Sequence, residues 1–143
     1  MNQENQPTFF IDRALGRKAI AGGLRKAGAT VEIHDDHFPP EALDVEWLPI
    51  VGQRGWLILT KDGGIGRRLL EQISVATSEA RVFVLSSGNL TGSEMAEIFV
   101  SALSRMQRFA LGNPQPFIAK VYKSGTVRMW QSRNQLLKLL KPR

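Results

Sequence analysis

The sequence predicts an α/β fold in which helices cover both faces of a mainly parallel sheet. Short apolar runs alternate with segments of helical length, the alternation repeats four times, and the chain then closes with a β-hairpin pattern. Right-handed crossovers between parallel strands turn this order into a three-layer α/β/α sandwich. We expect the closing hairpin to extend one edge of the sheet with antiparallel pairing.

The first half of the chain contains three short apolar runs and two segments with helical patterning. The apolar runs are too short for helices and are typical of buried strands. The first helical segment places apolar and basic side chains on different faces and ends at Gly28, a natural C-cap. In the second, Pro49 favours a start nearer Glu46, where proline would occupy the first turn. The strands are expected at residues 8–11, 30–33 and 56–59, and the helices at residues 16–27 and 43–53.

The second half opens on a glycine-rich loop and contains the longest predicted helix. Thr91 and Glu94 form a capping-box pattern at the start of that helix, and residues 123–125 form the turn of the hairpin. The later elements are expected at residues 65–78 (helix), 81–85 (strand), 91–111 (helix), 117–122 and 126–130 (hairpin strands) and 132–143 (basic amphipathic tail).

Length and composition indicate a single domain over residues 1–143, with residues 1–7 as a flexible N-terminus. The 143 residues are 43% hydrophobic, which is ordinary for a globular fold. The chain has no cysteine, so neither disulfides nor thiolate chemistry can contribute, as befits a reducing compartment. Residues 1–7 lack the pattern of a signal peptide, and no apolar run approaches the length of a membrane span. We therefore expect a cytoplasmic protein without membrane contacts.

The charge balance favours a polyanionic partner, with nucleic acid first. Lys and Arg number 19 against 13 Asp and Glu, for a net charge of +6, and the isoelectric point is near 10.2. Such an excess attracts phosphate backbones. The alternative is a basic protein whose charge serves only solubility.

Acidic residues follow the predicted strands. Asp12 follows the first strand and Asp62 the third, and the carboxyl ends of parallel strands meet at one edge of a sheet. Gathered carboxylates repel each other unless a cation lies among them, and Mg²⁺ or Mn²⁺ is the usual partner. Such an ion activates water and stabilises charge on a phosphodiester. A basic protein with an acidic pit is typical of a metal-dependent nuclease.

Further acids could complete this site. Asp44 and Glu46 open the helix before the third strand, but they point in different directions, so we expect only one of them to bind a metal directly. Asp35 and Asp36 follow the second strand. Their flanking residues, His34 and His37, indicate a solvated loop or the rim of the acidic site rather than a separate metal centre.

Candidate substrate-binding residues surround the same edge. Cationic side chains there could hold phosphates, and the polar residues after the fourth strand could contact substrate; the alternatives are solvent-facing charge and turn formation. The glycines around Ile65 lack the complete pattern of a nucleotide-binding loop. The candidate substrate-binding residues are Arg13, Lys61, Arg67, Arg68, Ser87 and Asn89.

Several segments resemble PIN-like domains in the same order: residues 9–12, 43–48 and 57–62. Residues 34–40 and 87–91 resemble segments of VapC-type toxin-like proteins. The resemblance covers about residues 9–129. It implies a three-layer α/β/α fold and a Mg²⁺- or Mn²⁺-dependent ribonuclease that acts on RNA.

In that family such a ribonuclease is commonly the toxin of a toxin–antitoxin pair. The resemblance places the metal-binding acids, which are also the catalytic residues, on Asp12, Asp44 and Asp62. Gly64 stands where many relatives carry another acid, and Asp35, Asp36 or Glu46 could replace a mid-chain acid that has no clear counterpart. The tail at residues 136–140 could contact an antitoxin, a second copy of the chain in a homodimer, or its own domain.

Two other functions fit parts of the pattern. In a receiver-type signalling domain, Asp62 would accept a phosphoryl group, with Ser86 or Ser87 and Lys120 as its partners. That class requires an acid pair after the first strand, where only Asp12 is present. The other alternative is a nuclease-like fold that binds RNA or a protein without cutting.

Overall fold

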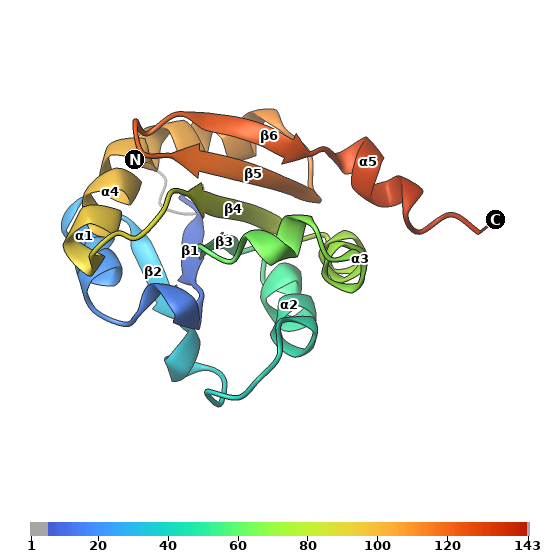
Figure 1. Ribbon diagram of the computed structural model, residues 1–143, viewed down its shortest axis with the longest axis horizontal. Coiled ribbons are helices and arrows are strands. Elements are labelled where there is room, and N and C mark those ends of the chain that lie inside the picture. The colour runs from blue at the N-terminus through green and yellow to red at the C-terminus, as the bar shows by residue number, and fades with distance from the viewer. Residues whose placement is uncertain (1–5, 143) are drawn as a thin grey trace.

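A computed structural model describes residues 6–142, which form a six-stranded sheet covered by helices on both faces (Figure 1). The strand order is β2-β1-β3-β4-β5-β6, with parallel pairing from β2 to β5 and antiparallel pairing between β5 and β6. The strands are β1 (Thr8–Ile11), β2 (Thr30–Ile33), β3 (Leu57–Thr60), β4 (Arg81–Ser86), β5 (Phe117–Tyr122) and β6 (Val127–Gln131). The predicted fold class and its closing hairpin are confirmed.

The helices are α1 (Ala19–Lys26), α2 (Asp44–Gln53), α3 (Leu69–Ser78), α4 (Gly92–Gly112) and α5 (Arg133–Lys138). Short 3₁₀ turns lie at Arg13–Leu15, His34–Asp36 and Gly63–Gly66. No helix within residues 6–142 is long and apolar enough to cross a membrane. Most of the expected flexible segment, residues 1–5, lies outside the described residues.

Two hydrophobic clusters bind the three layers together. Side chains alternate along each strand, so Phe9 and Ile11 face the cluster shared with α1 and α4, whereas Phe10 faces the cluster shared with α2, α3 and α5. Every residue of β3 is buried, as expected for a central parallel strand covered on both faces.

Two helices begin later than predicted, and glycine explains both shifts. The 3₁₀ turn Arg13–Leu15 ends at Gly16, whose φ of 85° interrupts the chain before α1. A second 3₁₀ turn, Gly63–Gly66, separates β3 from α3, which begins at Leu69. By contrast, α2 begins at Asp44 with Pro49 inside it, and α4 carries the predicted capping box. The late start of α3 changes the functional site.

The C-terminal segment packs in part on its own domain. Leu136 of α5 is completely buried in the cluster that contains α3 side chains. Beyond it, Leu139 and Leu140 are exposed, and the segment that follows α5 extends away from the sheet in Figure 1.

Gly66 is required for packing rather than for flexibility. A Cβ atom at this position would lie 2.3–2.6 Å from three atoms of the Trp130 ring. We expect Gly66→Ala to lower the free energy of unfolding by about 1–3 kcal/mol, because the indole would have to move. Urea denaturation measures this difference. Gly88→Ala is the control, because a Cβ there meets nothing within 4 Å. Equal stability of the two variants would contradict this account of Gly66.

Candidate metal centre

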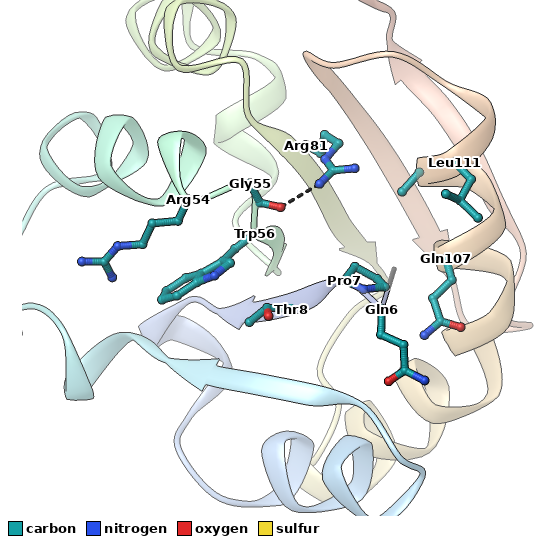
Figure 2. A pocket seen from close by; sticks show the side chains of 10 residues that line it. Gln6, Pro7, Thr8, Arg54, Gly55, Trp56, Arg81, Gln107 and Leu111 are labelled. Carbon is teal, nitrogen blue, oxygen red and sulfur yellow. Dashed lines mark hydrogen bonds between the residues drawn. The ribbon is translucent and has the colours of Figure 1, made fainter. Parts of the chain in front are cut away.

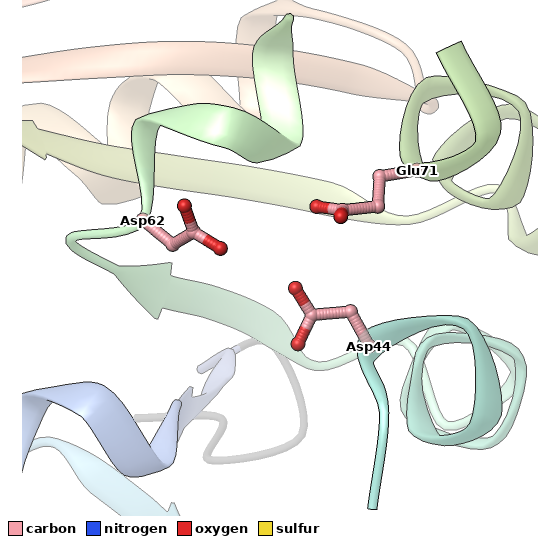
Figure 3. Close-up of side chains that lie close together, drawn as sticks. All are labelled: Asp44, Asp62 and Glu71. Atoms are coloured by element: carbon pink, nitrogen blue, oxygen red, sulfur yellow. The ribbon is translucent and has the colours of Figure 1, made fainter. Parts of the chain in front are cut away.

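Three carboxylates from separate elements converge at the carboxyl edge of the sheet (Figure 3). Asp44 is the first residue of α2, Asp62 follows β3, and Glu71 lies in the first turn of α3. Each offers an oxygen, and these oxygens all lie within 4.8 Å of one another. All three residues are half-buried. A shared cation would relieve the repulsion between them.

Asp12 lies beside this cluster but is not one of the three. The Thr60 hydroxyl donates a hydrogen bond of 2.7 Å to Asp12 Oδ2 and accepts one of 3.0 Å from the Asp62 backbone N–H. Thr60 therefore ties the acids that follow β1 and β3. Burial raises the pKa of Asp12, while the hydrogen bonds from Thr60 and the Arg13 backbone oppose this shift.

A loop amide and an arginine hold the Asp62 carboxylate in place. Its Oδ1 accepts a hydrogen bond of 2.9 Å from the Gly64 backbone N–H, and its Oδ2 accepts one of 2.8 Å from Arg68 Nη2. The same guanidinium donates to both Glu71 oxygens, through Nε to Oε1 at 2.5 Å and through Nη2 to Oε2 at 3.0 Å. One cation thus bridges two of the three carboxylates.

The surroundings of Asp44 raise the pKa of its carboxyl to about 6. Desolvation is the largest cause, followed by the negative charges of Asp12, Glu71 and Asp62, and the charge of Arg68 opposes the shift. The charge on Asp12 therefore acts on the three-carboxylate cluster. A set of carboxylate oxygens with an excess of negative charge fits a hard divalent ion such as Mg²⁺ or Mn²⁺.

The other candidate acids lie outside the three-carboxylate cluster. Glu46 accepts a hydrogen bond of 2.7 Å from the Leu43 backbone N–H and so caps α2. Asp35 forms ion pairs with Arg13 at 3.4 Å and Arg17 at 3.8 Å, and also contacts His34. Asp36 is exposed.

Glu71 is the acid that sequence reasoning missed. A helix starting at Ile65 would place Glu71 in its second turn, whereas the 3₁₀ turn before α3 brings it into the first turn. The signal available in the sequence was the group Gly63, Gly64 and Gly66, because glycines allow a turn to separate the strand from the helix.

A hollow of about 480 Å³ adjoins Asp62 and brings several predicted substrate-binding residues together. Lys61, Ser87 and Asn89 line it, and all three are exposed. Arg67 is also exposed and lies against Gly63, where a Cβ would be 3.1 Å from its Nη1. The hollow therefore offers a cation, a hydroxyl and an amide beside the Asp62 carboxylate.

A second pocket, of about 490 Å³, lies at the opposite edge of the sheet (Figure 2). Its lining includes Arg54, Trp56 and Arg81. Arg81 donates a hydrogen bond of 2.7 Å to the Gly55 carbonyl (Figure 2). Among residues 6–142, no acidic side chain that could bind a metal or accept a proton lines this pocket.

Lys120, the lysine of the receiver-type alternative, contacts an aromatic ring of the fold. It pairs in register with Val84 inside β5, and its Nζ lies 4.1 Å from the centre of the Trp130 ring. The lysine thus makes a cation–π contact within the fold.

We expect the metal-free protein to lose stability as the pH rises from about 4 to about 6. The pKa of Asp44 is raised to about 6 in the folded protein, so the native state binds this proton more tightly than the unfolded state does. The stabilisation is complete below the unfolded pKa and is lost as the pH rises through the folded pKa. Asp44→Asn should reduce this slope, measured from urea midpoints in EDTA. An unchanged slope would contradict the assignment.

Comparisons with known proteins identify the family of this chain. Residues 7–87 match the family model described as a PIN like domain. The chain is also 28% identical over 125 residues, 85% of its length and 90% of the relative's, to a protein of Mycobacterium tuberculosis (strain ATCC 25618 / H37Rv) named "Putative ribonuclease VapC45". No solved structure matches the chain significantly. Since the family model covers more than half of the residues, the chain belongs to the PIN-like domain family.

Proposed function

We propose that this chain is a divalent-metal-dependent ribonuclease and the toxin of a toxin–antitoxin pair. The observation that carries the proposal is the convergence of Asp44, Asp62 and Glu71 oxygens within 4.8 Å of one another. The PIN-like family and the ribonuclease name of the Mycobacterium tuberculosis relative support the same function.

Asp44, Asp62 and Glu71 would hold Mg²⁺ or Mn²⁺, and Asp12 would add negative charge beside them. When bound, the ion would activate a water molecule and stabilise the charge that develops on the attacked phosphodiester. Thr60 orients this site, since its hydroxyl contacts both the Asp12 carboxylate and the Asp62 backbone. The Gly64 N–H fixes one oxygen of Asp62.

RNA would lie in the hollow beside Asp62. Lys61 supplies a positive charge for the phosphate backbone, while Ser87 and Asn89 supply hydrogen-bonding groups. The net charge of +6 attracts the polyanion over longer distances.

An antitoxin protein would be the physiological partner of this cytoplasmic enzyme. Leu43 and Leu70 are 63% and 75% exposed and directly precede Asp44 and Glu71 in the chain. They offer apolar surface next to the acidic cluster, and a second copy of the chain is the other candidate to cover it.

Asp62→Asn and Asp44→Asn should each lower the rate of RNA cleavage by about 100-fold or more, because each removes a charged ligand. Initial rates on a fluorescent RNA in Mn²⁺ measure the loss, and thermal denaturation checks that the variants fold. Glu97→Gln, on the exposed surface of α4, is the matched control and should cleave normally. Wild-type rates in both aspartate variants would refute the proposed site.

Lys61→Ala should weaken RNA binding by about 3–10-fold and lower the slope of log affinity against log salt by about 1, as expected for one phosphate contact. Binding to the inactive Asp62→Asn protein separates this effect from cleavage. Lys138→Ala, at the end of α5, is the control. If the slopes of log affinity against log salt are equal for the two lysine variants, Lys61 does not contact an RNA phosphate.

A further inference from the structure

The Arg68 guanidinium places a positive charge in direct contact with the acidic cluster. It makes a forked contact with Glu71 and a further contact with Asp62, so three carboxylate oxygens already accept hydrogen bonds from one guanidinium. Forked arginine–carboxylate contacts are among the stronger ion pairs in proteins. A divalent ion among Asp44, Asp62 and Glu71 would therefore meet a positive charge in contact with two of its ligands.

Gly64 makes room for this guanidinium. A Cβ at Gly64 would lie 2.2–2.6 Å from Arg68 Nη1, Cζ and Nη2. The backbone of Gly64 is not in the left-handed region, so alanine is compatible with its conformation. Close approach of Arg68 thus accounts for the missing side chain at this position.

The Arg68 side chain can leave its place without disturbing the core. It is 55% exposed, whereas Glu71 is only 15% exposed. Glu71 is therefore held within the site, while the arginine lies over it from the solvent side.

We propose that Arg68 takes the place of a second cation in the metal centre, so that the cluster binds one divalent ion per chain. The guanidinium competes with that ion for the carboxylate oxygens of Asp62 and Glu71. The inference rests on the proposed metal-dependent function. A unit charge about 5 Å from a divalent ion changes its affinity about tenfold even in water-like surroundings. Arg68 is then a positioning residue that sets both the number and the affinity of bound ions.

Two variants remove the guanidinium by independent routes. Arg68→Gln deletes the charge, and Gly64→Ala expels the side chain while the net charge stays the same. Calorimetric titration with Mn²⁺ should give one ion per wild-type chain and at least about tenfold tighter Mn²⁺ binding in both variants. Because the readout is binding, it does not depend on catalytic activity.

Gly63 and Arg67, the residues directly before Gly64 and Arg68, supply the control variants for this titration. Arg67→Gln removes an equal charge one residue away, and Gly63→Ala meets only the end of the Arg67 side chain. Both should bind Mn²⁺ within about twofold of wild type, since the ion pairs of Asp62 and Glu71 among the described residues are with Arg68 and not with Arg67.

Three results would overturn the inference about Arg68. These are two Mn²⁺ ions per wild-type chain, no gain in affinity in Arg68→Gln and Gly64→Ala, or an equal gain in Arg67→Gln. If one of these three results is found while the wild type still binds Mn²⁺ and cleaves RNA, the proposed role of Arg68 is wrong and the proposed function stands. If neither the wild type nor any variant binds Mn²⁺, the proposed function fails as well.

Discussion

Repulsion between carboxylates at one edge of the sheet is the constraint on which the site depends. Asp12 and Asp62 follow adjacent strands, β1 and β3, and the first turns of α2 and α3 add Asp44 and Glu71. Burial and neighbouring charge raise the pKa of Asp44 to about 6, so the arrangement costs stability when no cation is bound. Thr60 and Arg68 offset part of this cost by hydrogen bonding to the acids. A fold that maintains such an arrangement favours a cation-dependent function.

The topology explains why these acids meet. From β1 the chain passes to β2 on one side, and β3 then pairs with the other side of β1. Ligand sites of open parallel sheets lie at such reversals, beyond the carboxyl ends of the strands. The hollow beside Asp62 lies at this edge, whereas the pocket around Trp56 lies at the other. The position of the site therefore follows from strand order, and its chemistry follows from a few side chains.

Much of this arrangement could be predicted from the sequence because it depends on local patterns. The apolar runs located the strands, the Thr91–Glu94 pattern located the start of α4, and the strand ends identified Asp12 and Asp62. Glu71 could not be found in this way, because its position depends on the turn that delays α3. The ion pair of Asp35 with Arg13 and the contact of Arg68 with Gly64 depend on tertiary packing, which short motifs do not encode.

The central claim is that Asp44, Asp62 and Glu71 together bind one divalent ion. The most direct measurement is an anomalous difference map from crystals grown with Mn²⁺. The account predicts one peak at about 2.0–2.3 Å from a carboxylate oxygen of each of the three residues, with the Arg68 guanidinium displaced from Glu71. A map with no peak at this edge of the sheet, or with the ion away from Glu71, would contradict it.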